Sequence, residues 1–99
     1  MAIKIHHGSG NVFTDLGFDS ALAENLRVRA DLMITIEKEI VARGLTQTKA
    51  ASLFGVSQPR VSDLTRGKID RFSIDTLVAM LGHAGISVHF TTQRKRHIA

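Results

Sequence analysis

Residues 45–68, LTQTKAASLFGVSQPRVSDLTRGK, carry the strongest indication of the fold in this sequence. Thr46 is a good N-cap for a first short helix, and Gly55 breaks that helix. Ser57 is a good N-cap for a second helix, which ends at Gly67. The apolar positions expected to face the core in these helices are Ala50, Ala51, Phe54, Val61 and Leu64. The stretch therefore predicts two short helices that meet at a glycine-containing turn.

Two helices joined in this way form a helix-turn-helix pattern, and the second of them begins with a proline, Pro59. Proline is tolerated in a first turn because the N–H that it lacks has no partner within the helix there. It also disfavours a helical conformation at Gln58, so the cap is either Ser57 or Gln58. In both cases the proline restricts the conformations of the first turn of the helix. Less conformational entropy is therefore lost when this turn binds a partner.

Two further helices are expected around this pair. Before it, a long helix begins at Asp19 or Ser20, with Ser20 as the N-cap candidate, and runs to about Arg43, where Gly44 stops it. Its apolar positions recur at steps of three, four and seven: Leu22, Leu26, Met33, Ile36 and Ile40. After the pair, a fourth helix begins at Ser73 or Asp70 and stops around residues 82–85. The segment NVFTDLGF, residues 11–18, is expected to be a tether or short turn packed on the core.

The last segment changes its hydrophobic period from 3.6 to 2, which predicts a strand. Its apolar side chains, Ile86, Val88 and Phe90, face one way. A lone strand is not stable in water, so it needs a partner. That partner is either a short N-terminal strand around residues 3–5 or a second copy of the chain. The second copy is favoured, because an isologous β contact is a common way to form a dimer. Ile86, Val88 and Phe90 are therefore the predicted dimerisation residues.

Composition indicates one small domain with an uneven charge. The chain has 99 residues and a net charge of +4. Residues 1–42 hold four Lys/Arg against six Asp/Glu, a balance of −2, whereas residues 43–71 hold six against two, a balance of +4. A basic middle suits a polyanion-binding face, although an unevenly charged solvated surface would look the same. The basic run at residues 94–96 either adds non-specific attraction or is a frayed terminus.

Several classes of function are not expected. The chain has no cysteine, which excludes disulfides and thiolate zinc sites. His6 and His7 are adjacent and point in different directions, so we expect no metal site. We expect no cofactor and no catalysis, because the sequence offers no His/carboxylate pairing and no glycine-rich phosphate loop. Without a membrane-length apolar run or a signal peptide, a cytoplasmic, nucleoid-associated protein with no membrane partner is expected.

Residues 45–68 resemble the core motif of the lambda-repressor-like (Cro/XRE) helix-turn-helix family. The matching positions are Thr46, Gln47, Ala50, Ala51, Gly55, Val56, Ser57, Gln58, Val61, Ser62, Leu64, Arg66 and Gly67. This resemblance implies a mainly α helix-turn-helix bundle that binds operator DNA as a dimeric repressor. The wider family has five-helix domains, whereas four helices can be marked here. The C-terminal strand would take the place of the fifth.

The flanks of the motif resemble a narrower group, the HigA-like antitoxins. The resemblance rests on GNVFTDLGF at residues 10–18, the long first helix and the strand after LGHAG. It implies a dimer that represses its own operon and also binds a small ribonuclease toxin. The expected organisation is an N-terminal arm and tether over residues 1–18, the DNA-binding domain over 19–85, and a dimerising strand with a basic tail over 86–99. The alternative is a protein-interaction module that mainly neutralises a toxin.

A recognition helix presents its N-terminal half to base edges in the major groove. The predicted base-reading residues are Gln58, Pro59, Arg60, Ser62 and Asp63. Gln58 suits adenine and Arg60 suits guanine, although both could be solvated surface. Asp63 would read cytosine or hold Arg60 or Arg66 in place. The predicted DNA-backbone contacts are Thr46, Gln47, Thr48, Ser57, Arg66 and Lys68, and the role of Gln47 is implied by the resemblance.

Overall fold

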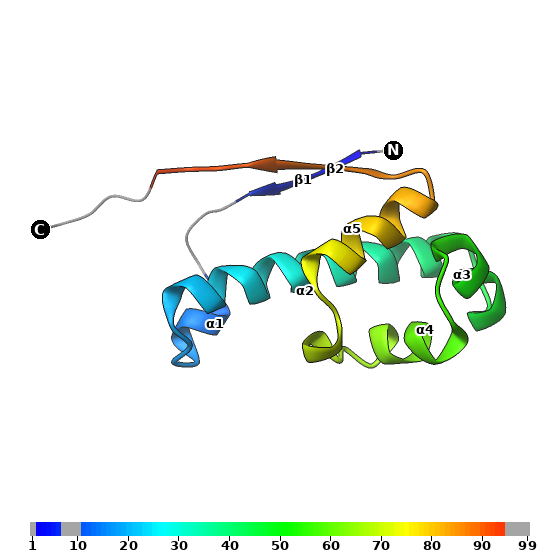
Figure 1. Cartoon of the computed structure of the whole chain (residues 1–99), viewed down its shortest axis with the longest axis horizontal. Helices are drawn as coiled ribbons and strands as arrows, with labels where there is room; N and C mark the ends of the chain where they lie inside the picture. Colours follow the sequence, from blue (N-terminus) through cyan, green and yellow to red (C-terminus); the bar gives the residue numbers. More distant parts are fainter. Residues whose placement is uncertain (1, 7–10, 95–99) are drawn as a thin grey trace, which may run out of the picture.

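The computed structural model describes residues 2–6 and 11–94. The chain is mainly helical and ends in a C-terminal strand (Figure 1). In chain order the elements are β1 (Ala2–His6), α1 (Val12–Asp15), α2 (Ser20–Ala42), α3 (Gln47–Phe54), α4 (Gln58–Thr65), the 3₁₀ turn η1 (Ile69–Arg71), α5 (Ile74–His83) and β2 (Ser87–Thr91). His7 and the tail residues Lys95 and Arg96 lie outside the described residues. Among the described residues, no helix is both long and apolar enough to cross a membrane.

Helix α2 is the longest described helix, and α1, α4, η1 and α5 all contact it. Its N-cap is Asp19, whose carboxylate accepts a hydrogen bond from the backbone N–H of Ala21. Ser20, the expected cap, is already the first helical residue, so that expectation is wrong by one position. The helix ends as expected, because Gly44 has a φ of +61° and turns the chain toward α3.

The core lies between α2 and the shorter helices α3, α4 and α5. Its largest fully buried side chains are Phe54, Phe72, Leu32, Ile36, Leu64, Leu77, Met80 and Leu81. The predicted core positions of the central stretch, Ala50, Ala51, Phe54, Val61 and Leu64, are all buried. The two members of the helix-turn-helix pair are therefore fixed to the body of the domain by aliphatic and phenylalanine packing.

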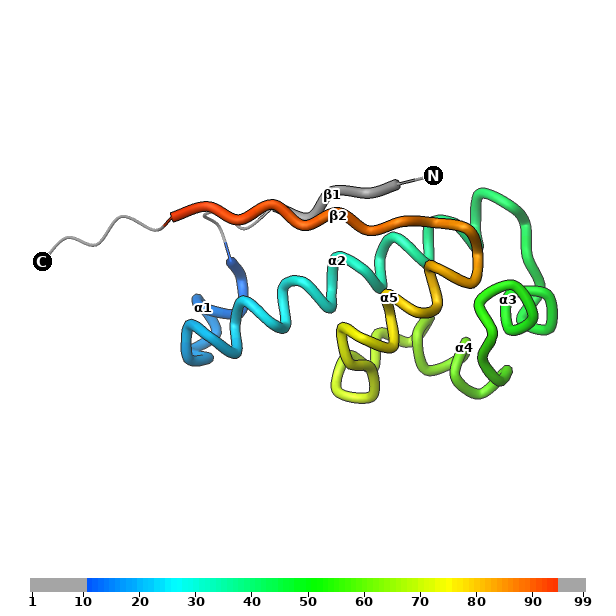
Figure 2. The backbone as a smooth tube through the Cα atoms, turned by 45° about the horizontal axis from the view of Figure 1, so that its top comes forward, coloured from blue at the N-terminus to red at the C-terminus, as the bar shows by residue number. Residues whose placement is uncertain are grey.

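Strand β2 pairs with β1 of the same chain, in parallel, with Ile3 opposite Val88 and Ile5 opposite Phe90. Figure 1 shows the two strands side by side, and Figure 2 shows how the chain leaves the end of α5 and continues into β2. The favoured partner, a second copy, is therefore wrong for this edge of β2. A parallel pair needs a long crossover connection, and the whole helical domain between β1 and β2 provides one. Just before β2, Ile86 is 2% exposed and belongs to the core, whereas Phe90 is 45% exposed.

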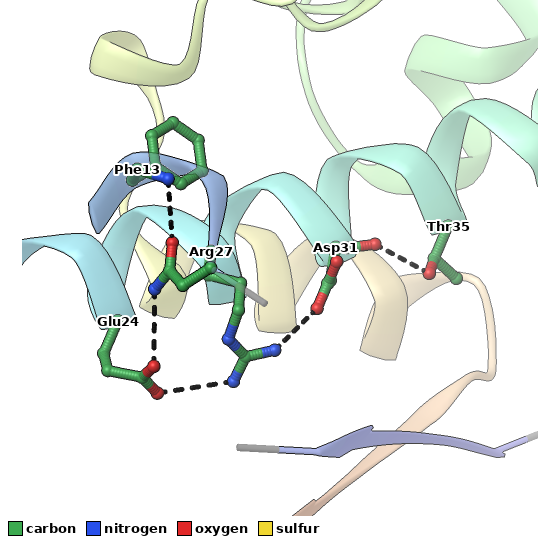
Figure 3. A network of polar contacts seen from close by, with 6 residues as sticks. Phe13, Glu24, Arg27, Asp31 and Thr35 are labelled. Atoms are coloured by element: carbon green, nitrogen blue, oxygen red, sulfur yellow. Dashed lines mark hydrogen bonds and ion pairs between the residues drawn. The ribbon is translucent and has the colours of Figure 1, made fainter. Parts of the chain in front are cut away.

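The segment before α2 forms a short helix, α1, which the sequence did not predict. The Asn11 side chain caps it by accepting from the N–H of Phe13 at 2.9 Å and donates to Glu24 of α2 at 3.3 Å. Arg27 bridges Glu24 and Asp31 in the same network (Figure 3). The expected packing of this segment on the core is wrong, because none of the α1 residues is buried. Polar contacts tether α1, while Val12 is exposed and Phe13 is half-buried.

Candidate nucleic-acid interface

The turn between α3 and α4 is built from local signals. The Thr46 hydroxyl accepts from the N–H of Lys49 at 3.2 Å and begins α3. Gly55 ends α3 in the left-handed conformation, with a φ of +68°. The Ser57 hydroxyl accepts from the N–H of Arg60 at 3.4 Å, so Ser57 rather than Gln58 is the cap of α4. Gln58 is therefore the first residue of the helix.

The outer face of α4 is polar and accessible. Val61 and Leu64 are buried, with 2% and 1% exposure, and hold the inner face against the core. Gln58 and Pro59 are exposed and Ser62 is half-buried. Because α-helical residues recur every 3.6 positions, Pro59 and Ser62 lie opposite the buried pair, and Gln58 flanks them at the N-terminal end. These three side chains form the outward surface at the N-terminal end of α4, which we call its leading edge.

Arg60, a predicted base-reading residue, is engaged with its own protein. Its guanidinium lies over the ring of Phe72, with the guanidinium carbon 5.0 Å from the ring centroid. Its Nη1 also donates to the backbone carbonyl of Arg71 at 2.8 Å. A cation over an aromatic face with a hydrogen bond to a carbonyl is an anchored arrangement.

Asp63 holds an arginine, as one of the two sequence interpretations suggested, but the arginine is a different one. Its carboxylate accepts from Nη1 of Arg71 at 3.1 Å, rather than from Arg60 or Arg66. Asp63 and Arg71 are eight positions apart, and η1 brings them together by returning the chain past α4. Sequence reasoning missed Arg71 as a site residue, and no local spacing could have identified it.

The predicted DNA-backbone residues lie at the two ends of the helix pair. Thr46, Gln47 and Thr48 are exposed at the N-terminal end of α3, where unpaired N–H groups favour an anion. Arg66, the C-cap of α4, is exposed, and Lys68 follows as a half-buried residue before η1. The side chains predicted to contact the DNA backbone therefore lie before and after the N-terminal end of α4.

An open pocket of about 430 Å³ adjoins this interface where η1 meets α2 and α5. Its lining residues are Asn25, Arg29, Arg60, Asp70, Arg71, Phe72, Ser73, Ile74 and Thr76. Arg29 anchors one wall, because its Nη1 donates to the carbonyls of Ile69 and Phe72 at 3.2 and 3.4 Å. The segment from residue 69 to 72 is therefore held by an arginine from α2 on one side and by Arg60 of α4 on the other.

The comparison with known families agrees with this geometry. A family model described as a helix-turn-helix domain matches residues 12–92, which run from the start of α1 to just beyond β2. No curated protein matches the sequence. The matched family is typically non-enzymatic. The match covers most of the chain, and α3 and α4 are the helix pair that names the family: the chain belongs to the helix-turn-helix domain family and is a DNA-binding protein.

Proposed function

We propose that this protein is a sequence-specific transcriptional repressor of the lambda-repressor-like (Cro/XRE) type, which binds operator DNA as a dimer in the cytoplasm and nucleoid. One observation carries the proposal. The first two residues of α4, Gln58 and Pro59, are exposed and follow the Ser57 cap, while Val61 and Leu64 hold the inner face of the helix against the core. A helix presented in this way fits the major groove with its N-terminal residues toward the bases.

Within this proposal, Gln58, Pro59 and Ser62 are the base-reading surface. Gln58 can donate to and accept from adenine with its amide, which discriminates by about 1–3 kcal/mol. The side chains of Arg60 and Asp63 are engaged by Phe72 and Arg71, so either would have to leave those contacts to reach a base. The backbone contacts are Thr46, Gln47, Thr48, Ser57, Arg66 and Lys68.

The test is DNA binding measured against salt concentration. A dimer that neutralises about six phosphates should lose affinity with a slope of log K against log salt near −5. Lys68→Ala should weaken binding to every duplex alike and reduce the slope, whereas Gln58→Ala should relax preference at one base pair. Equal losses on operator and random DNA for Gln58→Ala would contradict its reading role.

The DNA immediately upstream of its own gene is the first candidate operator, because the narrower proposal is an autoregulating antitoxin. Two half-sites about 34 Å apart, centre to centre, are expected if the dimer has two-fold symmetry. A footprint with that spacing would support the dimeric repressor. A single half-site, or no preference for this DNA over a scrambled competitor, would contradict autoregulation.

A second function, toxin neutralisation, is favoured by a separate surface. Four apolar side chains around α1 and the start of α2 are exposed: Val12 at 57%, Leu16 at 69%, Phe18 at 43% and Leu22 at 41%. Two exposed carboxylates, Asp15 and Asp19, lie beside these side chains, whereas Glu24 is paired with Arg27. An apolar surface with an acidic rim suits a basic protein partner, such as a small ribonuclease toxin.

This second function is tested by co-expression with the product of the neighbouring reading frame. Leu16→Glu should abolish a complex with a small basic toxin and leave operator binding unchanged. Val41→Glu is the matched control, because Val41 is an equally exposed apolar residue, at 75%, on the far half of α2. If both variants retain the complex, the α1 surface is not the toxin site.

A further inference from the structure

The recognition helix is connected to the segment after it by two contacts that run in opposite directions. Arg60 of α4 donates to the carbonyl of Arg71 at 2.8 Å, and the guanidinium of Arg71 donates back to Asp63 of α4 at 3.1 Å. Arg60 and Asp63 lie three positions apart, on neighbouring turns of one helix side. Together they bind both the backbone and the side chain of Arg71. We refer to these three residues as the Arg60–Asp63–Arg71 clasp.

The clasp is anchored in the core on one side and open to solvent on the other. The ring of Phe72 under Arg60 is 1% exposed, so the position of the guanidinium is fixed by a core side chain. At the other end, the Arg71 side chain is 50% exposed whereas the Asp63 side chain is 18% exposed. The carboxylate is therefore shielded by the arginine, and the surface beside the leading edge of α4 presents a guanidinium.

The ion pair between Asp63 and Arg71 affects how α4 would interact with DNA phosphates. A lone carboxylate on α4 would be repelled by DNA phosphates, and the ion pair with Arg71 neutralises it. Only Nη1 of Arg71 is used by Asp63, and a guanidinium carries five donors in a planar fork. The remaining donors suit a phosphate oxygen.

We propose that Arg71 is a DNA-backbone contact held in place by Asp63, and that Arg60 and Asp63 are positioning residues rather than base readers. The inference rests on the proposed function, because it assumes that α4 faces DNA. A pre-formed clasp reduces the entropy lost when the arginine binds a phosphate. The contacts of Arg29 with Ile69 and Phe72 hold the same segment from the α2 side.

The first experiment measures affinity for operator and random duplexes over a range of salt. Arg71→Ala should weaken both duplexes equally and reduce the magnitude of the salt slope by about one for each Arg71 that contacts a phosphate. Arg66→Ala, at the C-cap of the same helix, is the matched loss of one exposed arginine. If wild type binds DNA with the expected salt slope and Arg66→Ala reduces that slope, but Arg71→Ala leaves the slope unchanged, only this inference fails. If wild type binds no DNA, both fail.

A double-mutant cycle tests the role of Asp63. In the Arg71→Ala background, Asp63→Asn should strengthen DNA binding, because it removes an unpaired anion. In the wild-type background it should strengthen binding less, or weaken it, because Arg71 loses its support. An equal gain in both backgrounds would show that Asp63 acts only by repulsion and would overturn the clasp. The substitution is nearly isosteric, and a thermal melt checks that each variant is folded.

Arg60 is tested with duplexes that each carry one changed base pair. As a positioning residue, Arg60→Ala should reduce discrimination across the whole half-site. It should also shift the salt slope toward the Arg71→Ala value, and the double variant should shift it no further. Loss of preference at a single base pair, with the slope unchanged, would show instead that Arg60 reads a base.

Discussion

At the scale of single residues, Gly55 shows how one position can serve two purposes. It has a φ of +68°, a left-handed conformation that residues with a Cβ adopt at a cost. A Cβ at this position would also lie 2.9 Å from ring atoms of His83 on α5. Gly55 thus permits the turn between α3 and α4 and leaves room for the His83 ring of α5.

These two effects can be separated by substitution. Gly55→Ala should destabilise the protein by more than the roughly 1–2 kcal/mol that the left-handed conformation alone costs. Gly44→Ala is the matched control, because Gly44 has a φ of +61° with nothing within 4 Å of its added Cβ. Denaturant unfolding should show a larger loss at Gly55 than at Gly44. Adding His83→Ala should remove most of that difference, and equal losses at the two glycines would contradict the steric argument.

At the scale of elements, α4 is a short helix that depends on its ends. Eight residues are too few for a stable helix in isolation, so packing and capping must hold it. Val61 and Leu64 provide the packing, and the Ser57 hydroxyl provides the cap. The Ser57 cap lies beside the surface proposed to bind DNA. Substitutions at Ser57 can therefore change the free energy of unfolding and the affinity for DNA separately.

Two substitutions at Ser57 should behave differently. Ser57→Ala removes the cap and should lower the free energy of unfolding by about 0.5–1 kcal/mol. Ser57→Asp keeps a capping oxygen and adds a favourable charge at the helix N-terminus, so stability should be retained. The added charge should nevertheless weaken DNA binding through phosphate repulsion. Denaturant unfolding and a binding titration check the pair, and unchanged DNA affinity for Ser57→Asp would place this end of α4 away from the phosphates.

At the scale of the whole molecule, the proposed functions occupy different parts of one small domain. Helix α1 lies at the opposite end of α2 from α3, so the exposed apolar surface around α1 is separated from the surface proposed to bind DNA (Figure 1). The sheet has two described strands, so β2 has a second edge that no described strand occupies. A two-stranded sheet is marginal by itself, which favours a covering partner.

The proposed dimer is tested at Phe90, which is 45% exposed on β2. Phe90→Glu should shift the protein toward monomer in sedimentation velocity, because a buried carboxylate without a partner is costly. His89→Glu adds the same charge to the opposite face of the strand and should leave the dimer intact. A dimer that persists in Phe90→Glu would place the interface elsewhere.

Much of the helical architecture could be predicted because its signals act over a few residues. Thr46, Gly55 and Ser57 set the boundaries of α3 and α4 through local caps and a left-handed turn, and each lies where the sequence predicted. The strand at the C-terminus followed from its two-residue period. Asp19 replaced Ser20 as the cap of α2 because both residue types can accept the first free N–H groups.

Capping and hydrophobic period are local properties, so they were sufficient to predict α2 to α5, the helix-turn-helix pair and the inward faces of α3 and α4. They did not predict α1, and Leu22, expected on the apolar stripe of α2, is 41% exposed. Long-range packing, by contrast, decided that β1 pairs with β2, that Ile86 belongs to the core, and that no α1 residue is buried. It also decided that Arg71 meets Asp63 and that Arg60 lies over Phe72. These outcomes depend on where the folded chain returns, since each joins elements whose approach is set by packing rather than by neighbouring residues.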